Sequence, residues 1–289
     1  AAQIASMLGM TGGSSGFIIG LGIAVLVGIT IIGGIKRIAT VTEKLVPLMA
    51  IIYIVACLIV IGTHISFVGT AIGQIFDQAF NPQAGLGGLI GVLVIGFRRA
   101  AFSNEAGAGS ASIAHSAVRT KYSASEGLVA LLEPFIDTIV ICTMTALVII
   151  IFNGNGAFEY GSQAVTINGQ SYQGATLTSL AFGETISWFP QVLTIAIFLF
   201  AVSTMISWSY YGQQAWMYLF GKSKTMEITY KIIFLIFIII GASANMSSVW
   251  GFSDAMILAM VFPNMIGLLF LFPVVKDQLA KFEKAIKDN

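Results

Sequence analysis

Residues 96–118 read Gly-Phe-Arg-Arg-Ala-Ala-Phe-Ser-Asn-Glu-Ala-Gly-Ala-Gly-Ser-Ala-Ser-Ile-Ala-His-Ser-Ala-Val, and the interpretation of the whole chain depends on them. The stretch follows an apolar run and adds Arg98, Arg99, Asn104 and Glu105 to what would otherwise be a membrane-spanning helix. A charged group at the centre of such a helix costs roughly 2.5–3.5 kcal/mol, so it usually faces a cavity or a partner. Irregular backbone at that depth is tolerated only inside protein or beside water. The stretch therefore predicts a broken transmembrane helix, a feature typical of transporters.

The composition places the rest of the chain in a membrane as well. Of the 289 residues, 57% are hydrophobic and 9% are charged, and the mean hydropathy is +0.91. A soluble domain carries about 25% charged residues. Cys57 and Cys142 lie in apolar runs and are interpreted as small core side chains, while His64 and His115 are too few for a metal cluster. No catalytic or nucleic-acid-binding pattern stands out, so we expect neither an enzyme, a cofactor nor a nucleic-acid partner.

Seven membrane spans are expected in this all-α polytopic chain, because each crossing needs about 20 mainly apolar residues. A polar link covers residues 36–43, an interfacial amphipathic segment covers 66–80, and a polar excursion covers 153–186, with a short helix at 178–182. Residues 276–289 alternate charged and apolar side chains like a surface helix. The spans are residues 16–35, 44–64, the broken span 86–118, 126–152, 189–212 with a continuation toward 220, 229–244, and 249–275 with an interruption at Pro263 and Asn264.

The basic residues predict the orientation in the membrane. Apart from Arg98 and Arg99, the 14 lysines and arginines lie in alternate connections, among the first residues of the spans that follow these connections (Lys44 and Lys231), or in the C-terminal tail. Because cytoplasmic loops carry the basic excess, these connections and the C-terminus are expected to face the cytoplasm, in the plasma membrane. The chain starts without Met and reads as the tail of a helix before a loop at 11–15, so we expect a fragment of a longer protein.

Small residues surround the break in the third span. Glycine lets the backbone approach a ligand, half-helix N-termini favour a substrate carboxylate, and freed carbonyl groups suit a cation. Close packing of small residues between helices is the competing interpretation. The presence of Arg99, Asn104 and Glu105 in the same stretch favours a binding function.

Two carboxylates follow in the fourth span. Glu133 and Asp137 are four residues apart, and therefore share one helix face, and Pro134 is expected to bend the helix between them. They could bind an ion or relay a proton, but we favour a structural role in which they neutralise Arg98 and Arg99.

The fifth span carries a pair of hydroxyls, Ser203 and Thr204, one turn before Trp208. Hydroxyl and carbonyl oxygens suit Na⁺ as ligands, and Trp208 could line an apolar pocket. Hydrogen bonding to the carbonyl one turn back is the more common role of such residues in membrane helices, and spacing alone favours it. For His115 a capping or packing role is favoured over proton transfer. Asp254 and Asn264 are expected to satisfy a kink.

The chain resembles the sodium:alanine (alanine/glycine:cation) symporter family over essentially its whole length, as the C-terminal two-thirds of a full-length member. Ala100, Ser112 and Gln213 depart from residues usual in that family, and its other broken helix, with a Gly-Thr-Gly-Asn motif, is absent. The matching runs are Phe102-Ser-Asn-Glu-Ala-Gly107, Gly109-Ser-Ala111, Ile113-Ala-His115, residues 126–138, Trp208-Ser-Tyr-Tyr-Gly212, residues 33–38 and residues 43–47.

The resemblance implies a leucine-transporter-type fold of inverted repeats, of which this chain holds core helices 4–10. Residues 1–84 would end the first repeat, residues 85–275 would form the second, and residues 276–289 would be a cytoplasmic tail helix. The resemblance also assigns Ser203 and Thr204 to a Na⁺ site. We expect the pocket for the amino acid at Phe102, Ser103, Asn104, Gly107, Thr204 and Trp208. From the residues themselves we expect a structural or gating polar network of Arg99, Glu105, Glu133 and Asp137.

The expected function is Na⁺-coupled symport of a small neutral amino acid, alanine or glycine, across a lipid bilayer. Two alternatives stay open. A proton-coupled transporter of the same fold would use Glu105, Glu133 and Asp137 as proton carriers. A membrane sensor or scaffold subunit would show no concentrative uptake.

Overall fold

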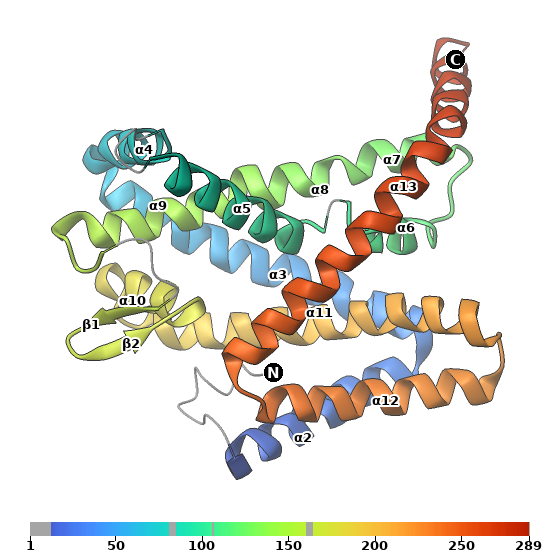
Figure 1. Cartoon of the computed structure of the whole chain (residues 1–289), viewed down its shortest axis with the longest axis horizontal. Helices are drawn as coiled ribbons and strands as arrows, with labels where there is room; N and C mark the ends of the chain where they lie inside the picture. The colour runs from blue at the N-terminus through green and yellow to red at the C-terminus, as the bar shows by residue number, and fades with distance from the viewer. Residues whose placement is uncertain (1–12, 81–84, 106, 160–163, 289) are drawn as a thin grey trace. The chain divides into compact units, whose positions relative to one another are not determined.

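The computed structural model is almost entirely helical and describes residues 13–80, 85–105, 107–159 and 164–288 (Figure 1). The predicted helix tail before residue 11 lies outside this range. Within the described residues, six helical segments are long and apolar enough to cross a membrane, and they match six of the seven predicted spans. They are Ser15–Ile32, Arg37–Thr63, Ser123–Asn155, Phe189–Phe220, Lys224–Ser243 and Ser247–Lys287.

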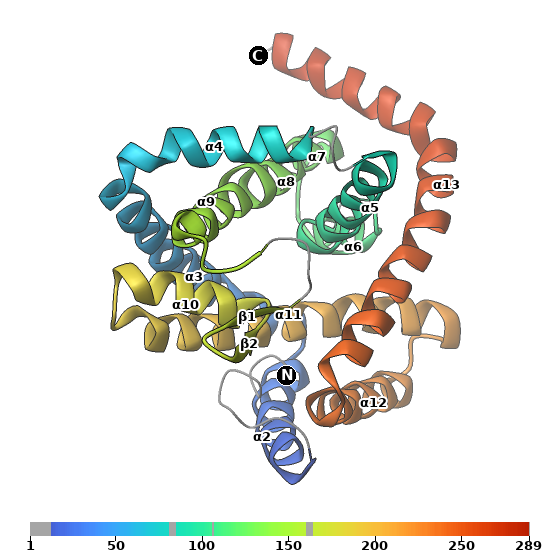
Figure 2. The same ribbon diagram turned by 60° about the vertical axis from the view of Figure 1, so that its left-hand side comes forward.

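The chain divides into two compact units, and the first contains residues 1–76 and 144–249. In this unit, α2 lies alongside α12 in both views (Figures 1 and 2), and α11 packs against both. Ile23, Val27 and Ile31 of α2 are buried with Ile206 of α11 and Ile238 of α12. The helices of the unit are α2 (Gly13–Ile32), α3 (Gly34–Thr63), α4 (Ile65–Ala79, which ends in the second unit), α9 (Thr143–Phe152), α10 (Ala175–Thr185), α11 (Phe189–Phe220) and α12 (Lys224–Ser243).

Two glycines one turn apart bring α2 and α12 into close contact. A Cβ atom on Gly16 would lie 2.6 Å from the carbonyl oxygen of Ala242, and one on Gly20 would lie 2.8 Å from the Cβ of Ala242. Small residues at four-residue spacing allow this approach, which any side chain would block. The backbones of α2 and α12 can therefore pack closely. This packing matters because lipid provides no hydrophobic driving force for helices to associate.

A second core joins α3, α9, α10 and α11. Phe182 of α10 is fully buried against Val60 and Cys57 of α3, and Tyr53 hydrogen bonds to Thr145 at 2.6 Å. Cys57 is thus a core side chain, as predicted. Cys142 is free but exposed, so its predicted burial is wrong.

The polar excursion contains structure that the sequence interpretation missed. Strands β1 (Val165–Ile167) and β2 (Gln170–Tyr172) pair antiparallel around Asn168 and Gly169, which have φ angles of 51° and 77°. Asn-Gly favours this tight turn because both residues tolerate positive φ. Helix α10 confirms the short helix predicted at 178–182 and extends it in both directions.

Two predicted interruptions are absent. The link at 36–43 is helical and belongs to α3, which begins at the positive-φ residue Gly34. Helix α13 runs without a break from Met246 to Lys287, through Pro263 and Pro273, and includes the predicted surface helix of the tail. Each proline removes only one intrahelical hydrogen bond, and both lie inside a continuous helix.

The second unit contains residues 77–143 and 250–289. In this unit, α5 and α6 are the two halves of the predicted third span, and α5 ends at the predicted break. The sequence predicts a bend at Pro134, and the fourth span changes its helix type there, from α-helix to a π-helical segment. The elements of this unit are α5 (Gly85–Ser103), α6 (Ser110–His115), α7 (Ser123–Ala130), α8 (Leu132–Pro134), η2 (Phe135–Cys142) and most of α13.

Candidate functional site

The third span is broken between Ser103 and Ser110, as the sequence predicts. Glu105, Gly107 and Gly109 all have positive φ angles, of 55°, 84° and 94°. Glycine adopts this conformation without penalty, but glutamate does so at a cost of order 1 kcal/mol or more, which the surroundings must offset. The helix thus unwinds before α6 begins.

Helix α13 holds this break through Asn264. The Nδ2 atom of Asn264 donates a hydrogen bond to the carbonyl oxygen of Gly107 at 2.8 Å. The Asn264 side chain also lies so close to Gly109 that a Cβ there would be 3.0 Å from its Oδ1 atom. The predicted role of Asn264 at a kink of its own helix is therefore wrong, because it bonds to the unwound backbone of the third span instead.

The side chains around the break are bonded to the fourth span and to each other. Asn104 donates from Nδ2 to Oγ1 of Thr138 at 2.7 Å, and the Ser103 hydroxyl donates to Asp137. Across the break, the Ser110 hydroxyl donates to the carboxylate of Glu105. These bonds satisfy polar groups that would otherwise be costly in an apolar environment.

The two arginines pair with Asp254 and not with Glu133 or Asp137. Asp254 Oδ2 lies 2.7 Å from Arg99 and 3.2 Å from Arg98, so the predicted neutralisation by the fourth span is wrong. Asp254 is buried, and it is the only acidic residue in the predicted seventh span at 249–275. A lone carboxylate in an apolar helix needs a counter-charge, and that signal in the sequence could have identified the pairing.

Aromatic rings cover this ion pair. The Arg99 guanidinium lies 5.0 Å from the ring centre of Trp250 and 5.6 Å from that of Phe102, and the two rings are 6.1 Å apart. Cation–π contacts of this kind fix the direction of an arginine. Phe102, which we expect in the pocket for the amino acid, is therefore positioned by the same cluster.

Glu133 lies instead beside His115, on the far side of the break from the arginines. The carboxylate of Glu133 is 3.5 Å from Nε2 of His115, and Glu126 is 2.7 Å from Nδ1. His115 thus bridges two carboxylates, and the favoured packing role does not account for this arrangement.

The hydroxyl pair of the fifth span belongs to the first unit, and its members differ in environment. Ser203 is buried and donates a hydrogen bond to the carbonyl of Phe200 at 2.9 Å, the common role of serine in membrane helices. Thr204 is exposed, and Trp208 lies one turn further on the same face, 5.9 Å from the ring of Tyr211. Since Ser203 uses its proton in this bond, its oxygen keeps lone pairs that can coordinate a cation.

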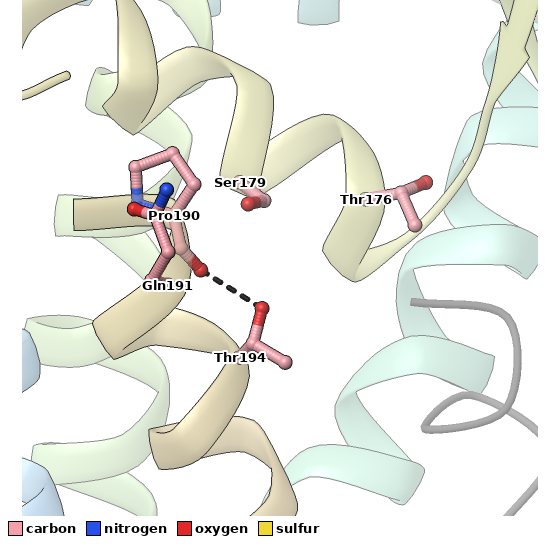
Figure 3. Close-up of a pocket in the computed structure, with 5 residues that line it drawn as sticks. All are labelled: Thr176, Ser179, Pro190, Gln191 and Thr194. Atoms are coloured by element: carbon pink, nitrogen blue, oxygen red, sulfur yellow. Dashed lines mark hydrogen bonds between the residues drawn. The ribbon is translucent and has the colours of Figure 1, made fainter. Parts of the chain in front are cut away.

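A separate open pocket lies in the first unit where α10 meets the start of α11 (Figure 3). Its volume is about 290 Å³, and Thr194 in its wall donates a hydrogen bond to the Pro190 carbonyl at 2.8 Å. Its lining is neutral and contains no predicted site residue. The lining residues are Thr176, Ser179, Pro190, Gln191 and Thr194.

A polytopic helical chain with a broken helix, stabilised by polar side chains from its neighbours, has the features of a membrane transport protein. Comparison with known proteins gives the family. The profile of the sodium:alanine symporter family matches residues 1–289, and the chain belongs to this family. The relatives that it matches carry the names of symporters, carriers or transporters.

Three relatives illustrate the range of the family. The chain is 38% identical over 288 residues to the "Sodium/alanine symporter AgcS" of Methanococcus maripaludis. It is 34% identical over 281 residues to the "Probable sodium/glutamine symporter GlnT" of Bacillus subtilis. It is 30% identical over 277 residues to the "Sodium/proton-dependent alanine carrier protein" of Bacillus sp. strain PS3. These matches cover 99%, 96% and 93% of this chain but 61%, 56% and 62% of the relatives, so the chain spans about three fifths of their length.

Proposed function

We propose that this chain forms part of a secondary active transporter that couples the uptake of a small neutral amino acid, alanine or glycine, to Na⁺. The observation that supports this most directly is the break in the third span, where Glu105, Gly107 and Gly109 have positive φ angles. Asn264 bonds to the carbonyl of Gly107 within this break. Backbone groups freed by unwinding can bind a zwitterion, which offers both a carboxylate and an amine. Family membership supports the same class of function.

In this proposal the amino acid contacts the backbone of residues 102–107, because the side chains of Ser103 and Asn104 already bond to the fourth span. By resemblance to the family, Phe102, Thr204 and Trp208 are also assigned to the amino acid, whose side-chain size Phe102 and Trp208 would limit. A leucine-transporter-type inverted-repeat fold would supply the remaining part of the pocket from another broken helix.

Na⁺ is the proposed coupling ion, bound by Ser203 and Thr204. Hard oxygen ligands suit this cation, and the lone pairs of Ser203 are available because its hydrogen is donated to Phe200. Thr204 would contact both the ion and the amino acid, which is a direct way to couple their binding.

Uptake of labelled alanine by the full-length protein in proteoliposomes tests the proposal. We expect concentrative uptake with a Na⁺ gradient and its loss when choline replaces Na⁺. Thr204→Ala combined with Trp208→Ala should reduce uptake at least about tenfold, the effect of about 1.4 kcal/mol. Thr178→Ala, in α10 of the same unit, is a hydroxyl control that should not change uptake. Uptake that persists in choline would contradict the proposed role of Na⁺.

Proton coupling is the second candidate, because one relative is named as a sodium/proton-dependent alanine carrier. Glu105, Glu133 and Asp137 would carry the proton. Uptake driven by a pH gradient in the absence of Na⁺ would favour this candidate over Na⁺ symport.

A further inference from the structure

His115, the last residue of α6, lies between two carboxylates of the next helices. Its Nδ1 atom is 2.7 Å from Oε1 of Glu126 in α7, and its Nε2 atom is 3.5 Å from Oε2 of Glu133 in α8. Glu126 and Glu133 are two helical turns apart and face the same imidazole. The side chains of His115 and Glu126 are 26% and 18% exposed, whereas Glu133 is 53% exposed. The cluster is thus largely enclosed but reachable by protons through Glu133.

The two carboxylate contacts of the ring favour its protonated form. A neutral imidazole has one N–H donor and one nitrogen lone pair, whereas an imidazolium has two donors. With a carboxylate beside each nitrogen, the neutral ring would direct its lone pair at an anionic oxygen. Only the cation can interact favourably with both glutamates at once.

We propose that His115, Glu126 and Glu133 form a proton-binding site that fastens α6 to the fourth span when His115 is protonated, and that this site sets the pH dependence of transport. The inference rests on the proposed transport function. It is distinct from the amino-acid and Na⁺ sites, because none of the three side chains is assigned to either of them. The proton stays bound as a regulator and is not carried across the membrane.

The position of the cluster explains how it would act. Helix α6 has only six residues, and its first turn is held by the Ser110–Glu105 bond and by the contact of Gly109 with Asn264. Its last residue is held by the glutamates. The charged groups in contact with His115 come from α7 and α8, and Glu105 lies at the opposite end of α6. Asn264 of α13, which contacts Gly109 just before α6, does not titrate. Loss of the proton leaves the Nδ1–H bond to Glu126 but turns the Nε2 lone pair toward Glu133, so the end of α6 is held less firmly while the break keeps its other anchors.

Uptake measured in proteoliposomes with the same pH inside and outside tests this site. Between about pH 5.5 and about pH 8.5, the range in which histidine titrates, wild-type uptake should fall as pH rises. His115→Gln should lower uptake about tenfold at the acidic end and give a flat pH profile. His115→Arg keeps a positive donor between the glutamates and should retain uptake with a flat profile.

Controls separate this effect from misfolding. His64→Gln should keep the wild-type profile, because Nδ1 of His64 lies 3.0 Å from the Val60 carbonyl of its own helix. Glu126→Gln should move the fall in uptake to lower pH. A wild-type pH profile in His115→Gln would overturn the proposal, as would wild-type profiles in both Glu126→Gln and Glu133→Gln.

A spectroscopic measurement keeps the site testable even if Na⁺-driven uptake fails. Spin labels on cysteines placed at Ser112 and Leu132, both exposed, report the distance between α6 and α8. We expect a narrow distance distribution at low pH that broadens as pH rises, and a broad one at every pH in His115→Gln. A narrow distance distribution at every pH in both the wild type and His115→Gln would overturn the proposed attachment of α6 to the fourth span. It would not bear on the transport function.

Discussion

Asp254 balances the charges of the broken helix. Both arginines that precede the break converge on one carboxylate oxygen of this buried residue. Two cations and one anion leave a net positive charge, which the rings of Phe102 and Trp250 offset in part by cation–π contact. Removing one member of a buried ion pair is far more costly than removing a surface pair, because the remaining charge stays desolvated.

We expect Asp254→Asn to lower the free energy of unfolding by about 2–3 kcal/mol, less than for a fully buried pair because Arg98 and Arg99 are partly exposed. Thermal unfolding in detergent measures the change. Asp277→Asn is the matched control, since Asp277 pairs with Lys281 but both of these side chains are exposed. It should change stability by no more than about 0.5 kcal/mol. Equal effects of the two substitutions would contradict the structural role of Asp254.

For individual side chains, the sequence predicts which ones take part in the polar contacts around the break better than it predicts their bonding partners. The break at 104–109 is predictable because charge and clustered glycine are costly within an apolar membrane-spanning run and are rarely found there without a structural cause. The choice between Asp137 and Asp254 as partner of the arginines is not predictable, because it depends on which helices meet. Helix α13 meets the break through Asn264 and Asp254, and neither contact can be inferred from spacing alone.

Helices α2 and α12 show how elements associate in this chain. Lipid is as apolar as the side chains, so helices are held together by close packing rather than by burial from water. Gly16 and Gly20 provide that packing on α2, opposite the small residue Ala242 on α12. The existence of the six long helices follows from hydrophobic length alone and is predictable, whereas helix ends and interruptions such as the link at 36–43 depend on packing.

Gly20→Val should destabilise the pair of helices by about 1–3 kcal/mol, the typical cost of overpacking. Its side chain would meet Ala242 and the backbone of Ile239, which lies 3.0 Å from an added Cβ. Gly22→Val places the same side chain on the same helix where no atom lies within 4 Å, and it should be nearly neutral. The comparison, made by thermal unfolding, removes differences in helix propensity. Equal loss in both variants would show that the close approach of α2 and α12 is not the cause.

The sidedness of the whole chain stays a prediction from charge, and the second unit brings two of the basic segments together. Helix α13 has 42 residues and is about 63 Å long at 1.5 Å per residue, about twice the thickness of the hydrocarbon core. The helix is therefore longer than one crossing needs, and its lysine-bearing residues 276–287 are the part expected outside the hydrocarbon core. There Phe282 packs on Tyr122 at 5.7 Å and Gln278 accepts a hydrogen bond from Ser123, so the lysine-bearing tail and the basic connection after α6 lie together. Both belong to the set of segments predicted to face the cytoplasm.

Labelling of single cysteines in intact cells tests this sidedness for the full-length protein. In a Cys142→Ser background, Gln170→Cys in the exposed hairpin should react with a membrane-impermeant maleimide, because the excursion that contains it is predicted to lie outside. Lys222→Cys, in the exposed connection between α11 and α12, should react only after the cells are permeabilised. Basic residues are retained on the cytoplasmic side during insertion, which is the physical reason for the difference. The reverse labelling pattern would invert the whole topology, and with it the direction from which α6 and the His115 cluster receive protons.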